Sequence, residues 1–144
     1  MHLYAVLIPI AMMLRILRLS GRAGALVYYQ RLRPAVFRAA LIPWIEKADH
    51  SSLEHAREEI RRSEPEYLSL LFPFHLALST ELSAKIDGLR EKLGGDLSKD
   101  AKGARSAFLR TALARWLEDA ERDPRAALEE ILAELVKRGR KPNQ

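Results

Sequence analysis

The sequence predicts a mainly α-helical fold that contains one short β-strand. Two helical patterns follow the strand, and 48% of the residues are hydrophobic, which is enough to form a core. The strand is predicted from a period of two over about six residues, typical of a half-buried strand, in which Phe74, Leu76 and Leu78 alternate with His75, Ala77 and Ser79.

Two helices are expected after this strand. Ser79 is a good N-cap, and Gly94 is a typical residue at a helix end. Between them, Leu82, Ile86, Leu89 and Leu93 recur at intervals of three and four. The second helix is expected from about Ser106, after a long connection over residues 95–104. Its apolar face comprises Phe108, Leu109, Ala112, Leu113, Trp116 and Leu117.

A lone strand leaves one row of backbone hydrogen-bonding groups without partners. A second copy of the chain would satisfy them if its strand paired antiparallel around a two-fold axis. The sequence therefore predicts a homodimer, whose core would comprise Phe74, Leu76, Leu78 and Trp116.

The segments HLALSTELSAKIDGLREKLG and ARSAFLRTALARWLED, within residues 72–121, carry this strand–helix–helix order. The order resembles the ribbon-helix-helix family of dimeric DNA-binding repressors. The resemblance implies paired strands in the major groove of double-stranded DNA, with Pro73, His75 and Ala77 facing the bases. It also implies phosphate contacts near the start of the second helix, from Lys99, Lys102, Arg105 and Ser106. The long connection and the sparsely polar strand face depart from the family's usual pattern.

The positive charge of the chain is concentrated at its N-terminus. Residues 1–45 hold six arginines and no acidic residue, whereas residues 46–144 hold 18 basic and 19 acidic residues. An anionic partner, either nucleic acid or a lipid surface, is therefore expected for the N-terminal third.

The apolar run from Leu3 to Leu14 is too short to cross a bilayer, which takes about 20 residues. Three interpretations remain open for this run: a buried helix in a soluble protein or dimer, a membrane-surface or anchor segment, and a processed leader. The buried helix is favoured, because no basic region precedes the run and no small-residue cleavage site follows it.

Further helices are expected over residues 25–45, either as one helix or as two divided at Pro34, and over residues 49–62 and from Pro124 onward. Ser51 and Glu54 are expected to form a capping box. No internal repeat is evident. We therefore predict an arginine-rich helical extension (1–66), a ribbon-helix-helix-like domain (67–122), and a C-terminal amphipathic helix with a basic tail (123–144).

The sequence lacks cysteine, a phosphate-binding glycine loop and a nucleophile with a base at motif spacing. We therefore predict a cytoplasmic non-enzyme without cofactor, metal or catalytic residues. The expected function is DNA binding as a homodimeric repressor or plasmid or phage regulator. The alternative is a helical interaction protein, antitoxin-like or a membrane-surface adaptor, with a protein partner at the C-terminal helix.

Overall fold

The central strand has its partner in the same chain. In the computed structural model, which describes residues 2–22, 29–62 and 64–139, β2 (Leu71–Leu78) pairs antiparallel with β1 (His2–Pro9). The prediction of a single strand is therefore wrong, and the argument that the strand needs a second copy of the chain no longer holds. The homodimer itself stays a prediction.

The N-terminal apolar run is a strand followed by a helix, not one buried helix. β1 ends at Pro9, and α1 (Ile10–Arg22) begins directly after it. Both faces of β1 carry apolar side chains, so the sequence shows no alternation that would have marked a strand. No helix in the described parts of the chain is long and apolar enough to cross a membrane.

α2 (Tyr29–Glu46) is one helix that continues through Pro34 and Pro43, and residues 25–28 of the predicted segment lie outside the described residues. α3 (His50–Arg61) begins after a capping box, but Asp49 and Ser52 form it, not Ser51 and Glu54. The short helix α4 (Pro65–Ser69) then leads into β2.

The helices after β2 begin and end close to the local signals. The Ser79 side chain accepts a hydrogen bond from Leu82 N and caps α5 (Thr80–Leu93), which ends at Gly94, as predicted. The expected long connection is wrong, because it contains a 3₁₀ turn (Gly95–Lys99) and the start of α6 (Ala101–Arg122), which is capped by Asp100. α7 (Pro124–Gly139) is the last helix.

The order of elements occurs twice in the chain. β1, α1, α2 and α3 are followed, after α4, by β2, α5, α6 and α7. Residues 33–48 of α2 and the following turn align with residues 105–120 of α6, and eight of the sixteen positions are identical. The prediction of no internal repeat is therefore wrong. The identical pairs are Arg33/Arg105, Ala35/Ala107, Arg38/Arg110, Ala40/Ala112, Leu41/Leu113, Trp44/Trp116, Glu46/Glu118 and Ala48/Ala120.

The two halves are related by an approximate two-fold axis through the ribbon, the name we use for paired β1 and β2. A shift of 70 residues carries the first residue of α1 onto that of α5, and it carries β1 onto β2 to within one residue at each end. Ala5 and His75, which are 70 residues apart, lie directly opposite each other in the ribbon. An antiparallel pair has its local two-fold axis between such residues, so the axis passes through this pair.

Contacts between the halves follow the same symmetry. The guanidinium of Arg33 lies 4.9 Å from the ring centre of Phe74, and that of Arg105 lies 4.2 Å from the ring centre of Tyr4. The two buried arginines also make matching contacts between the halves. Arg38 pairs with Glu134 on α7, and Arg110 pairs with Glu59 on α3. Each half therefore makes the same kinds of contact with the other half, as the two subunits of a symmetric dimer do.

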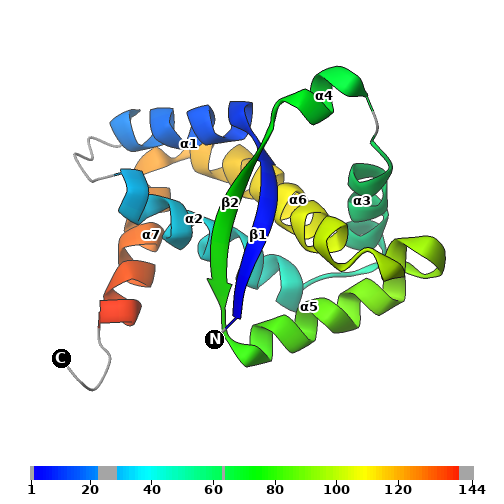
Figure 1. Cartoon of the computed structure of the whole chain (residues 1–144). Coiled ribbons are helices and arrows are strands. Elements are labelled where there is room, and N and C mark those ends of the chain that lie inside the picture. The colour runs from blue at the N-terminus through cyan, green and yellow to red at the C-terminus, as the bar shows by residue number, and fades with distance from the viewer. Residues whose placement is uncertain (1, 23–28, 63, 140–144) are drawn as a thin grey trace.

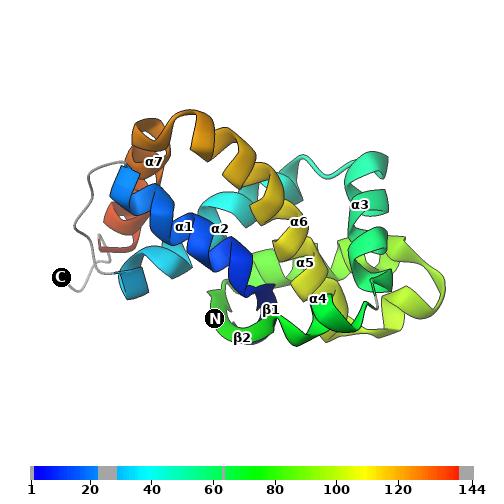
Figure 2. The same cartoon turned by 90° about the horizontal axis from the view of Figure 1, so that it is seen from above.

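One main hydrophobic core joins elements from both ends of the described chain. It includes Val6 and Ile8 of β1, Leu76 of β2, Phe108 of α6 and Ile131 of α7. The predicted boundaries at residues 66 and 122 therefore do not separate independent cores. In Figures 1 and 2 the ribbon lies on one side of the molecule, with α6 behind it.

Candidate functional site

The outer ribbon face, which we define as Leu3, Ala5, Leu7, Pro73, His75 and Ala77, is not covered by any described helix (Figure 1). These residues alternate with the buried side chains of the inner face, and Leu3 is 68% exposed. Because opposite residues of an antiparallel pair point to the same side, the three residues from each strand form one surface. Five of the six are apolar, and His75 supplies the single polar side chain.

The edge of β1 is held by α6. Leu7 N donates to Ser106 Oγ at 3.0 Å, and Arg110 Nη1 donates to Leu7 O at 2.9 Å. The polar groups of Leu7 therefore point away from β2. Pro73 lies opposite Leu7 and has no N–H, so it suits a position whose backbone faces the free edge of β2. This proline weakens that edge as a site for adding another strand.

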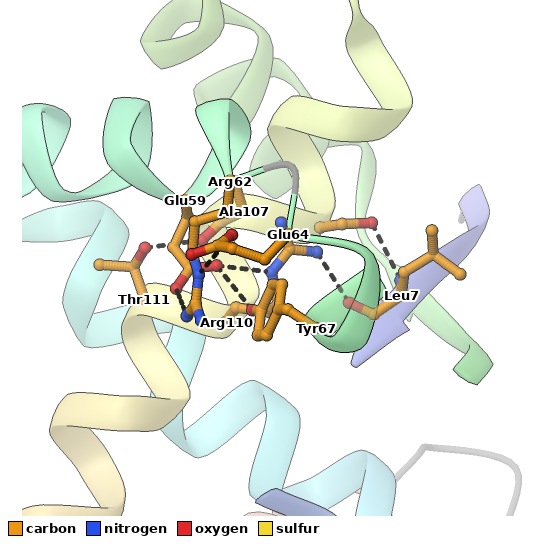
Figure 3. Close-up of polar contacts among 9 residues, drawn as sticks. Leu7, Glu59, Arg62, Glu64, Tyr67, Ala107, Arg110 and Thr111 are labelled. Carbon is orange, nitrogen blue, oxygen red and sulfur yellow. Dashed lines mark hydrogen bonds and ion pairs between the residues drawn. The ribbon is translucent and has the colours of Figure 1, made fainter. Parts of the chain in front are cut away.

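Behind the ribbon lies a polar cluster, which we call the Arg110 cluster: Leu7, Glu59, Arg62, Tyr67 and Arg110 (Figure 3). Buried Arg110 donates from Nε to Glu59 Oε2 at 3.0 Å, and the Tyr67 hydroxyl donates to the same oxygen at 2.8 Å. Arg62 lies 3.5 Å from the other oxygen of Glu59 and stacks over the Tyr67 ring. The cluster thus joins β1, α3, α4 and α6 through one carboxylate.

The environment of Tyr67 favours its neutral phenol. Partial burial, the hydrogen bond to Glu59 and the charge of that carboxylate raise its pKa to about 12, above the ordinary value of 10.0. Tyr67 therefore stays protonated near neutral pH, and we expect the contacts of the Arg110 cluster to stabilise the fold.

We expect Tyr67 to titrate well after an ordinary tyrosine. Because the folded state holds the proton more tightly, its contribution to stability is complete below pH 10 and is lost as the pH rises towards 12. Ultraviolet absorbance of tyrosinate during a pH titration measures this step. Tyr67→Phe should remove the late component only, and an unchanged late component would contradict the assignment.

Two of the four predicted phosphate residues, Arg105 and Ser106, do not lie at the start of the second helix. α6 begins at Ala101, where the Asp100 side chain accepts from Gly103 N at 2.9 Å and places a negative charge at the helix N-terminus. Arg105 and Ser106 lie further along the helix, and Ser106 is only 1% exposed. The expected start of the second helix at about Ser106 is therefore wrong.

Lys99 and Lys102 are on the surface, as a phosphate contact requires. Lys99 lies 3.8 Å from Asp96, in an exposed pair that contributes little to binding or stability. Arg105 stacks against Tyr4 on the inner side of the ribbon, so of the four predicted phosphate residues only Lys99 and Lys102 are exposed.

Three of the four residues of the predicted dimer core pack inside a single chain. Leu76 and Leu78 are 1% and 2% exposed among residues of their own chain, and Phe74 packs partly buried beside them. Trp116 borders a surface groove. The inward direction of the first three side chains is confirmed, but the burial needs no second copy.

Two adjoining grooves lie along α6, away from the ribbon. One, of about 570 Å³, lies among α2, α6 and α7, and the other, of about 690 Å³, lies between α3 and α6. They share Trp44, Asp49, Ser52, Arg115 and Asp119. Since both contain charges of both signs, neither selects an anionic or a cationic ligand. In the described parts of the chain, no three potential metal ligands lie together.

Sequence reasoning missed the Arg110 cluster and the three β1 residues of the outer ribbon face. The available signal was the similarity of residues 33–48 to residues 105–120, which repeats an arginine at positions 38 and 110 within an apolar helix face. Arginine in such a face indicates a buried ion pair.

No family model, no curated protein and no solved structure matches this chain.

Proposed function

We propose that the chain is a non-enzymatic DNA-binding protein, a single-chain counterpart of a ribbon-helix-helix dimer. One observation carries the proposal: an antiparallel ribbon with an approximate two-fold axis, in which each strand is followed by two helices. The major groove of B-DNA admits a two-stranded ribbon. A repressor, or an accessory regulator of a plasmid or phage, would use such a unit.

The side chains of the outer ribbon face limit which DNA base sequences this protein can distinguish. His75 can make one hydrogen bond to a base, and the apolar residues can touch thymine methyl groups. None of them makes the bidentate contact that arginine makes with guanine. Affinity therefore comes mainly from phosphates, with Lys99 and Lys102 as exposed contacts and with modest sequence preference.

We expect the double variant Lys99→Gln/Lys102→Gln to bind all duplexes more weakly than the parent. The slope of log affinity against log salt should flatten by up to about two units, near 0.9 for each lost phosphate contact. Electrophoretic retardation or fluorescence anisotropy at several salt concentrations measures both effects.

Two controls accompany this measurement. Lys47→Gln removes an exposed lysine that borders the groove between α2 and α7, and it should leave binding unchanged. His75→Ala should relax preference at one base pair and keep the salt slope. No binding by the parent at about 50 mM salt, where non-specific attraction is strong, would end the DNA proposal.

The apolar composition of the outer ribbon face favours a second candidate, a protein-interaction module. Leu3 and Leu7 would then anchor a partner protein, and Leu132 and Val136 on α7 expose further apolar surface. Leu3→Asp separates the candidates, because it should abolish binding of an apolar partner. It should weaken DNA binding only to the extent of one added negative charge.

A further inference from the structure

Large exposed hydrophobic side chains gather at the N-terminus of the chain and around α4. Among the described residues, nine such side chains are exposed, and seven of them fall within residues 3–17 and 68–72. Scattered exposed leucines are ordinary, but a concentration of them marks an interaction surface.

α1 is apolar on its inner face and also on an adjoining stripe that is exposed to solvent. Its inner face packs Met13, Ile16 and Leu19 into the protein. Its solvent-facing stripe holds Ile10, Leu14 and Leu17, which recur at intervals of four and three and are 39% to 49% exposed. A helix at the surface of a soluble protein is normally polar on its solvent side.

The second half of the chain shows that the fold does not require this stripe. With the shift of 70 residues, the positions on α5 that correspond to the stripe are Thr80, Ala84 and Asp87, which are polar or small. The buried positions nevertheless match, since Ile16 and Leu19 correspond to buried Ile86 and Leu89. The same helix in the same environment is thus polar in one half and apolar in the other. The fold itself therefore does not account for the apolar stripe on α1.

α4 extends this apolar stripe. Ile10 N donates to Leu70 O at 3.0 Å, which joins the start of α1 to the end of α4. In Figures 1 and 2 the two helices extend to opposite sides from one end of the ribbon. We call the combined set the α1–α4 surface: Ile10, Leu14, Leu17, Leu68, Leu70 and Phe72, each more than a third exposed.

The two ends of this surface carry opposite charge. Arg18 is exposed on α1, beyond Leu17, and Glu66 is exposed on α4, before Leu68. A two-fold rotation about the middle of the surface would bring Arg18 of one copy towards Glu66 of the other, with the leucines packed between them. An anionic membrane would meet Glu66 at one end of the surface, where a second copy offers Arg18 instead.

We propose that the α1–α4 surface binds a second copy of this chain in an isologous contact. The contact differs from the strand pairing expected from the sequence alone, because it leaves the outer ribbon faces of both copies open. The proposal does not depend on the DNA-binding function.

The test is sedimentation equilibrium of the full chain from micromolar to hundreds of micromolar. The parent should dimerise. Leu14→Ala/Leu17→Asp, which gives α1 the residues of α5, should weaken the dimer at least about 30-fold, because it removes two of the six apolar side chains of the surface and places a carboxylate among the rest. Thermal unfolding should show that this variant folds as the parent does. Leu132→Asp, at an exposed position on α7, is the matched control and should leave the dimer intact.

A charge exchange tests the partner itself. Arg18→Glu should weaken the dimer, and Arg18→Glu/Glu66→Arg should restore it, since each copy would again offer opposite charges. A parent that stays monomeric, or a dimer that survives Leu14→Ala/Leu17→Asp, would overturn the proposal. So would a monomer that co-sediments with phosphatidylserine vesicles and loses that binding in the same variant, because a lipid surface would then be the partner.

Discussion

Leu76→Lys is expected to leave the chain without a cooperative unfolding transition. Leu76 is 1% exposed and lies on the inner ribbon face opposite Tyr4, within the main core. An unpaired ammonium group there must be dehydrated or neutralised, at a cost of more than about 4 kcal/mol. Since domains have about 5–15 kcal/mol of total stability, most of the fold is lost. Circular dichroism during thermal and urea unfolding measures the effect.

The next residue gives the matched control. His75 is on the outer ribbon face and exposed, so His75→Lys should change the free energy of unfolding by no more than about 0.5 kcal/mol. The same variant adds a cation to the face proposed to meet DNA, and it should raise DNA affinity. If Leu76→Lys unfolded as cooperatively as the parent, the burial of Leu76 in the main core would be contradicted.

Arg110→Ala is expected to lower the free energy of unfolding by about 3–5 kcal/mol, as breaking one side of a buried ion pair does. The substitution removes the hydrogen bonds to Glu59 and to Leu7 O, and it leaves a mostly buried carboxylate with weaker partners. Urea unfolding should show a lower midpoint with an unchanged slope, since the same surface is exposed on unfolding.

Two comparisons separate this effect from a general loss of charge. Arg62→Ala removes the more exposed arginine of the same cluster, and it should cost no more than about 1 kcal/mol. Arg38→Ala should cost about as much as Arg110→Ala, because Arg38 is equally buried and its Nε lies 3.0 Å from Glu134. If Arg110→Ala lowered the free energy of unfolding by less than Arg62→Ala, the buried ion pair would not be what stabilises this region.

The part of the fold that depends on local signals could be predicted from the sequence. Alternation gave the direction of Phe74, Leu76 and Leu78 in β2, and Ser79 and Gly94 gave the two ends of α5. β1 could not be predicted in this way. Its inner residues enter the core while its outer residues are also apolar, so neither a period of two nor one of 3.6 stands out.

The arrangement around the site required information from distant parts of the chain. Ser106 reads as a helix start in the sequence, yet Asp100 caps the helix and Ser106 is buried against β1. Pro73, His75 and Ala77 were correctly expected away from the core, but Leu3, Ala5 and Leu7 beside them were not expected. The halves also diverge at exposed positions, such as Leu14 and Ala84, which concealed the repeat.

The two-fold axis through Ala5 and His75 relates residues that are not the same. A symmetric homodimer must display every side chain twice, and its partner therefore meets the same residue from either direction. In this chain one half presents a methyl group where the other presents an imidazole, and leucine where the other presents proline. Any partner that binds across the ribbon can thus be held in one orientation. A DNA duplex bound there would have one of its two possible directions relative to β1 and β2.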